Sequence, residues 1–163
     1  MWVMKITRRP IQRADEAFLL ELYSSTRVDE LAVTDWTPEQ KAAFLRMQFD
    51  AQAAHYETYY GGSEFSVVEV DGVAAGRLYV ARWASEIRIV DVALIPDFRN
   101  LGIGSRLIRA ILAEGAASGK PVTIHVEKFN PALRLYQRLG FLPKEDKGVY
   151  LLLEWSPDET AQV

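Results

Sequence analysis

Apolar positions recur along this chain with two different spacings, and the changes between them mark the expected elements. β-Branched and alternating runs predict strands at residues 3–8, 65–70, 73–81, 87–95, 121–127 and 148–155, with a short extra strand near Phe141. Apolar residues three and four positions apart predict helices over residues 15–25, 37–60, 104–114 and 131–139. The order predicts an α/β (α+β) fold with a mixed, mostly antiparallel sheet and helices on both faces.

Local signals fix several boundaries. Thr37, followed by Pro38 and by Gln40 three residues after the cap, is a helix start. Asp71-Gly72 between two strand-like runs indicates a type I′ hairpin. Residues 26–36 are expected to be an irregular link. We expect one helix face to carry the heptad-like positions Phe44, Met47, Ala51, Ala54 and Thr58.

Composition excludes several classes of function. The 163 residues are the length of one domain, which we place at residues 1–156, with a polar tail at 157–163. A net charge of −3 gives no reason to expect nucleic acid as a partner. The absence of Cys excludes disulfides, thiolate catalysis and zinc-thiolate sites, and no metal is expected. No apolar run suits a signal peptide or a membrane span, so the expected location is cytoplasmic, away from membranes.

The chemistry-bearing stretch begins at the apolar strand of residues 87–95, which Pro96 ends. Gly102 and Gly104 then open an amphipathic helix, and such a helix start attracts phosphates. A dinucleotide fingerprint would need a third small residue where Leu107 stands. A P-loop would need Gly-Lys-Ser/Thr, which the sequence lacks. An unrelated nucleotide binder using the same helix start stays an alternative.

Two segments resemble a known family. Arg99-Asn100-Leu101-Gly102-Ile103-Gly104, an Arg-x-x-Gly-x-Gly after a Pro-ended strand, resembles the pyrophosphate-binding segment of the GNAT superfamily of acyl-CoA-dependent N-acyltransferases. The segment from Asn130 to Phe141 is similar to that superfamily's second signature, Asn-x-x-Ala-x-x-x-Tyr-x-x-x-Gly-Phe. The resemblance implies an N-acetyltransferase that uses acetyl-CoA (coenzyme A) and a primary amine of a small molecule or protein. A non-catalytic acyl-CoA-binding or regulatory module on the same fold is the alternative.

The resemblance also implies a mode of cofactor binding. The two central parallel strands would splay apart, and the pantetheine arm would lie between them against the backbone of residues 92–94. The cofactor-binding residues that we expect are Val92, Ala93, Leu94, Arg99, Asn100, Leu101, Gly102, Ile103, Gly104, Ser105, Asn130, Ala132 and Tyr136.

Acyl transfer to an amine needs an acid and a base. Tyr136 matches the family's tyrosine and is the expected acid for the departing thiolate, since a phenol has a pKa near 10. The expected base is Glu86 or Asp91, with Glu127 and His125 on the next strand as further candidates; Arg88 stands where many relatives carry a glutamate. Asp91 has an alternative role in structural hydrogen bonds, and His125 one as a structural histidine.

The acceptor is not identified by the sequence. Candidate acceptor-binding residues lie in the first helices and their link and near the end of the third strand. They are Arg27, Trp36, Tyr56, Tyr59 and Arg82. The acyl group and the oligomeric state also stay open, although homodimers are common among similar proteins.

Overall fold

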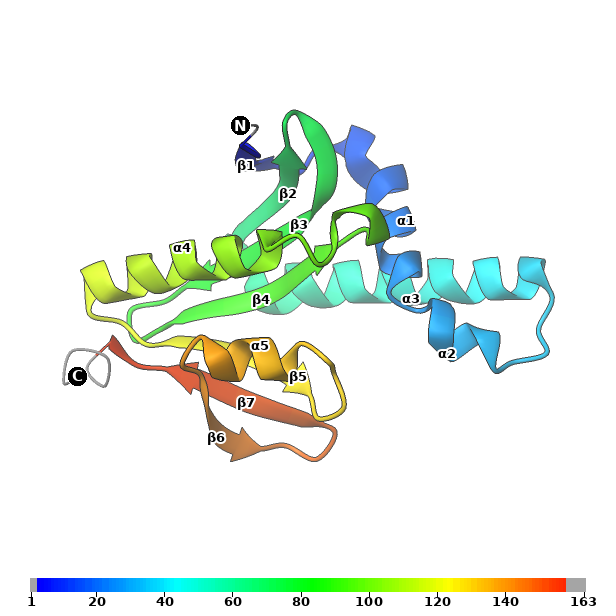
Figure 1. The fold of residues 1–163 in the computed structure, drawn as a ribbon. Helices are drawn as coiled ribbons and strands as arrows, with labels where there is room; N and C mark the ends of the chain where they lie inside the picture. Colours follow the sequence, from blue (N-terminus) through cyan, green and yellow to red (C-terminus); the bar gives the residue numbers. More distant parts are fainter. Residues whose placement is uncertain (1–2, 158–163) are drawn as a thin grey trace. The chain divides into compact units, whose positions relative to one another are not determined.

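The computed structural model describes residues 3–157, so most of the expected polar tail lies outside the described residues. Within the described residues, seven strands follow the order β1-β2-β3-β4-β5-β7-β6. The strands are β1 (Ile6–Pro10), β2 (Glu64–Val70), β3 (Val73–Arg82), β4 (Ile87–Leu94), β5 (Val122–Glu127), β6 (Leu142–Asp146) and β7 (Tyr150–Trp155) (Figure 1). The helices are α1 (Glu16–Ser25), α2 (Val28–Ala32), α3 (Pro38–Tyr60), α4 (Ile103–Ser118) and α5 (Leu133–Arg138), with 3₁₀ turns at Arg13–Asp15 and Pro96–Phe98.

The chain divides into two compact units. The first comprises Met1–Arg77 and Ala93–Arg99, and the second comprises Leu78–Val92 and Asn100–Val163. Strands β3 and β4 run through both units, so each unit holds part of these strands.

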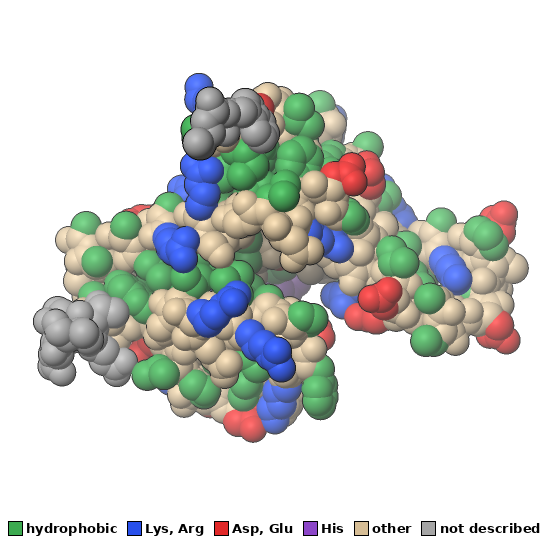
Figure 2. Space-filling model, viewed as in Figure 1, with side chains coloured by type: hydrophobic (Ala, Val, Ile, Leu, Met, Phe, Trp, Pro, Cys, Tyr) green, Lys and Arg blue, Asp and Glu red, His purple; other side chains and the backbone are tan. Residues whose placement is uncertain are grey.

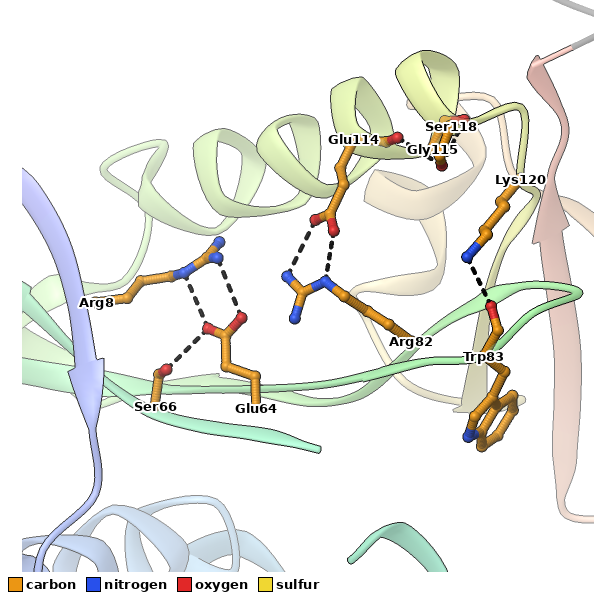
Figure 3. A network of polar contacts seen from close by, with 9 residues as sticks. All are labelled: Arg8, Glu64, Ser66, Arg82, Trp83, Glu114, Gly115, Ser118 and Lys120. Carbon is orange, nitrogen blue, oxygen red and sulfur yellow. Dashed lines mark hydrogen bonds and ion pairs between the residues drawn. The ribbon is translucent and has the colours of Figure 1, made fainter. Parts of the chain in front are cut away.

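In the first unit, β1 pairs antiparallel with β2, which turns into β3 through Asp71 and Gly72. Both turn residues have positive φ, 51° and 82°, as a type I′ turn requires, so the hairpin prediction is confirmed. Pro10 ends β1, the edge strand, where its missing N–H removes no bond from an inner ladder. Arg8 of β1 donates to Glu64 of β2, which also accepts from Ser66 (Figure 3).

The helices of the first unit depart from the sequence prediction in two places. The expected irregular link contains α2, a short helix whose Leu31 is buried. In α3 the Thr37 cap is confirmed, but the expected packing face is wrong. Met47 is 60% exposed, whereas Phe49 is buried against Leu19 and Tyr23 of α1. The helix therefore packs through the stripe that contains Phe49.

In the second unit, β5 pairs parallel with β4 and antiparallel with β7, and the expected extra strand is β6 beside β7. Helix α4 buries Leu107, Ile108 and Ile111. Gly115 lets α4 approach the sheet, since a Cβ there would lie 2.9 Å from a Val122 methyl group. Helix α5 begins at Leu133, later than predicted, because Asn130 forms a turn before it.

None of the helices in the described part of the chain is long and apolar enough to cross a membrane.

Candidate functional site

The glycine turn before α4 leaves the start of this helix open. Asn100 and Gly102 have positive φ, 61° and 81°, and Gly102 precedes the first helical residue without any side-chain cap. The Arg106 N–H donates to the Gly102 carbonyl at 3.1 Å. The N–H groups of residues 103–105 precede this bond in the chain and form the first turn of the helix. Such N–H groups attract anions.

The two glycines of the turn differ in backbone conformation and surroundings. Gly102 adopts a left-handed conformation that side chains disfavour. Gly104 has no such constraint, and a Cβ built on it would meet no protein atom within 4 Å. Packing within the protein therefore does not explain Gly104. Its missing side chain leaves open space beside the N-terminus of α4, which fits the close approach of a phosphate group.

The parallel ladder between β4 and β5 is short. It pairs residues 87–89 with residues 122–124 and, among the described residues, ends at Ile89 and Ile124. Both strands continue, β4 to Leu94 and β5 to Glu127. Residues 90–94 of β4 are all partly exposed, whereas Ile87 and Ile89 are buried. The two central strands thus part after three residue pairs, as expected for the splayed strands.

Tyr136 lies on α5 with its ring buried, 6.0 Å from the Phe141 ring between centroids. Burial, with a smaller contribution from the charge of Asp91, raises the pKa of Tyr136 to about 12. Among the described residues, its hydroxyl has no hydrogen-bond partner. The phenol is therefore protonated at neutral pH.

Arg99 and Asn130 hold local contacts in their own units. In the first unit, Arg99 donates to the Leu94 carbonyl at 2.9 Å and to the Ser25 hydroxyl at 3.0 Å. In the second unit, the Asn130 side chain accepts from the Ala132 N–H at 2.9 Å. These contacts hold the segment that follows β4 and the turn before α5. Ser25 was not identified from the sequence, because its hydrogen bond with Arg99 joins residues that are far apart in the chain.

A polar group lies on one side of the paired part of β4 and β5. Thr123, which is fully buried, donates to the Glu86 carboxylate and accepts from Arg88 at 2.8 Å. Arg88 also pairs with Glu86 at 3.3 Å and lies over the Trp83 ring, 5.1 Å from its centroid. His125 follows on the same strand. Thr123 was missed by sequence reasoning, and its only signal is a polar residue within an apolar strand.

The candidate acceptor-binding residues fall into two groups. In the first unit, Arg27 pairs with Glu30 at 2.8 Å, and the Trp36 ring lies 5.0 Å from the Phe44 ring. There too, the rings of Tyr56 and Tyr59 contact the His55 ring, at 6.1 and 4.7 Å between centroids.

In the second unit, Arg82 of β3 instead donates to both carboxylate oxygens of Glu114 on α4, at 2.5 and 3.0 Å (Figure 3). This ion pair gives Arg82 a role inside the fold. The acceptor-binding role of Arg82 and of the four candidates in the first unit stays a prediction.

Basic side chains are frequent on the helices of the second unit. Figure 2 shows Lys and Arg side chains over α4 and α5. Exposed arginines of these helices are Arg106, Arg109, Arg134 and Arg138. They give α4 and α5 a local positive charge, although the whole chain has a net charge of −3.

Comparison with known proteins shows related folds. A PaiA N-acetyltransferase from Thermoplasma acidophilum, in complex with coenzyme A, aligns at a TM-score of 0.70 and 16% identity over 93% of this chain and 99% of that one. A GNAT acetyltransferase from Elizabethkingia anophelis with acetyl-CoA bound aligns at 0.60 and 18% identity, over 93% and 97% of the chains. YncA from Salmonella typhimurium, a putative acetyltransferase with acetyl-CoA, aligns at 0.59 and 24% identity, over 94% and 95%. No curated protein matches the sequence.

The sequence profile described as the acetyltransferase (GNAT) family matches residues 25–141, which is more than half of the chain. This span contains both motifs singled out above, the glycine turn at 99–104 and the segment from Asn130 to Phe141. The chain therefore belongs to the acetyltransferase (GNAT) family.

Proposed function

We propose that this protein is an N-acetyltransferase that transfers the acetyl group of acetyl-CoA directly to a primary amine of a small molecule or protein. The observation that carries the proposal is the open start of α4, where Gly104 leaves room that no protein atom fills. The bound coenzymes of the structural relatives agree with this assignment.

The glycine turn and the positive helix surface would hold the donor. The N–H groups of residues 101–105 would donate to the diphosphate, with the N-terminal end of the α4 dipole adding to the attraction. Arg99 would add its charge after exchanging its present contacts with Leu94 and Ser25. Arg134 and Arg138 would raise the local concentration of this polyanionic ligand.

The separated part of β4 would hold the reactive arm. Residues 90–94 continue past the last β4–β5 pair, so their backbone offers ladder positions for an extended ligand. Val92, Ala93 and Leu94 are the residues that we assign to this contact. An N–H among them would polarise the acyl carbonyl as negative charge develops on its oxygen.

When bound, acetyl-CoA supplies an acyl group activated as a thioester. The transfer forms an N–C bond and breaks a C–S bond, and the bonding electron pair leaves on sulfur. The amine nitrogen must lose a proton, and the sulfur must gain one. Tyr136 is the proposed acid, since its buried phenol is protonated at neutral pH. Glu86 and Asp91 are the bases predicted from the sequence.

Amine-dependent release of free thiol tests the proposal. We expect the purified protein to bind acetyl-CoA saturably and to release CoA when a suitable member of an amine panel is added. Mass spectrometry should find that amine heavier by one acetyl group. Saturable binding without turnover on any amine would favour the non-catalytic acyl-CoA-binding module. No saturable binding of acetyl-CoA would contradict both readings.

A further inference from the structure

His125 occupies the point at which the two central strands part. It follows Ile124, the last residue of β5 that pairs with β4. Side chains alternate along a strand, so His125 shares a face with Thr123 and Glu127. Across the sheet, Leu152 of β7 lies opposite His125, and Glu145 of β6 lies opposite Leu152. His125 is thus the first residue of β5 beyond the ladder, as Val90 is the first residue of β4 beyond it.

The imidazole is not held as a structural histidine would be. Among the described residues, no hydrogen bond engages either ring nitrogen, although the ring is partly buried. Buried polar groups that serve structure are almost always hydrogen-bonded. A partly exposed imidazole with open nitrogens is instead suited to take a proton from a ligand.

The surroundings keep this imidazole neutral. Burial lowers the pKa of His125, and the cations Arg88 and Lys147 lower it further, against the opposing effect of Glu145 and Glu86. Arg88 is fixed by Thr123, Glu86 and the Trp83 ring, so its charge has a defined place. A neutral imidazole has one nitrogen that can accept a proton at neutral pH.

Glu86 is less well placed to be the base. Its carboxylate already accepts hydrogen bonds from Thr123 and Arg88. It also precedes β4 at the paired end of the strands, four residues before Val90, where the separation begins. At about 3.3 Å per residue, that is roughly 13 Å along the strand.

We propose that His125 is the base that accepts the proton of the acceptor amine, and that Glu86, Arg88 and Thr123 position its surroundings. The inference rests on the proposed acetyl transfer. The imidazole takes a proton as the N–C bond forms and passes it to solvent, while Tyr136 gives one to the departing sulfur and regains one from solvent. Asp91, whose charge acts on Tyr136, and Arg88, whose charge acts on His125, are three residues apart on β4, so their side chains lie on opposite faces of this strand.

The pH dependence of His125→Gln tests this role. With an alkylamine acceptor at pH 7, we expect kcat/KM to fall at least 100-fold, in the range of lost acid–base catalysis. The loss should shrink as the pH approaches the amine's pKa of about 10, where the acceptor is neutral without help. The Kd of acetyl-CoA should stay within about twofold, and imidazole in the buffer should restore part of the rate of His125→Ala.

A second measurement follows the imidazole itself. The chain has two histidines, so NMR of the wild type, His55→Gln and His125→Gln assigns both ring signals. Arg88→Gln removes a cation, so we expect the His125 titration midpoint to rise. The acid limb of kcat/KM should move to higher pH by the same amount, which a merely structural histidine would not cause.

The outcomes separate this inference from the proposed function. If the wild type releases CoA with an amine, and His125→Gln keeps its kcat/KM and pH profile, then His125 is not the base while acetyl transfer stands. A large loss in Glu86→Gln, with the His125 signal and its midpoint unchanged, would likewise overturn the assignment. If the wild type turns over no amine, both proposals fail.

Discussion

Arg82 of β3 and Glu114 of α4 form an ion pair with two hydrogen bonds, at 2.5 and 3.0 Å. The residues are 32 positions apart in the sequence, and both side chains are about one third exposed. The pair ties the end of a strand to the last half of the helix that begins at the glycine turn. It therefore connects two elements of the second unit, and we expect it to contribute to the stability of that unit.

We expect Arg82→Gln to lower the free energy of unfolding by about 0.5–1 kcal/mol, the range for a partly exposed ion pair of good geometry. Because the guanidinium is occupied by Glu114, the acceptor KM should not change. Glu114→Gln is the matched variant, and the double variant should lose little beyond either single one. Thermal unfolding and steady-state kinetics check this. A raised KM with unchanged stability would instead support the acceptor role of Arg82.

Gly104→Ala should separate stability from ligand binding. The new methyl group meets no protein atom and replaces a helical glycine, so stability should rise by about 0.5–1 kcal/mol. The same methyl group would occupy the space assigned to the diphosphate, so the Kd of acetyl-CoA should increase at least tenfold. Calorimetry of unfolding and of binding measures both effects.

Gly102→Ala provides the contrast for that experiment. Its φ of 81° strains an alanine, so we expect a loss of about 1–2 kcal/mol in stability. If Gly104→Ala binds acetyl-CoA as tightly as the wild type, the diphosphate does not lie against this turn.

Tyr136→Phe should lower kcat by about 100-fold or more, because the proton donor is removed while the ring that packs against Phe141 is kept. The pKa of about 12 keeps the wild-type phenol protonated, so this residue should produce no loss of kcat between pH 7 and 10. Full turnover in the variant would show that another group protonates the sulfur.

The same residue makes stability depend on alkaline pH. The pKa of Tyr136 is about 12 in the fold against 10.0 for a free phenol, so the unfolded chain loses this proton first. The contribution of the protonated Tyr136 to the free energy of unfolding is complete below about pH 10 and is lost as the pH rises toward about 12. Chemical unfolding over this range should show a steeper decline for the wild type than for Tyr136→Phe, by at most about 2–3 kcal/mol.

The two faces of α3 should respond differently to truncation. Phe49 is buried against α1, so Phe49→Ala should cost about 3 kcal/mol or more. Met47 is 60% exposed, so Met47→Ala should change stability by less than about 0.5 kcal/mol. Urea unfolding of both variants checks the assignment. An equal loss of stability in both variants would show that Met47 is buried in solution by contacts other than those among the described residues.

Short-range physics explains what the sequence by itself determined. The Thr37 cap, the Asp71-Gly72 turn and the glycine turn before α4 each depend on the backbone preferences of a few adjacent residues. Periodicity likewise identified the strands and the buried face of α4, because that helix has one clear apolar side. The two motifs, and with them the family, are local in the same sense.

Only the tertiary structure decided which residues meet across long separations. In the folded chain Arg82 pairs with Glu114, and Thr123 forms hydrogen bonds with Glu86 and Arg88. The β4–β5 ladder ends at the residue before His125. Helix α3 packs against α1 through the face that contains Phe49 and not the face that contains Met47. A weakly amphipathic helix takes its orientation from the elements that it packs against. Spacing along a chain cannot fix such contacts, because they depend on where separate elements place their side chains.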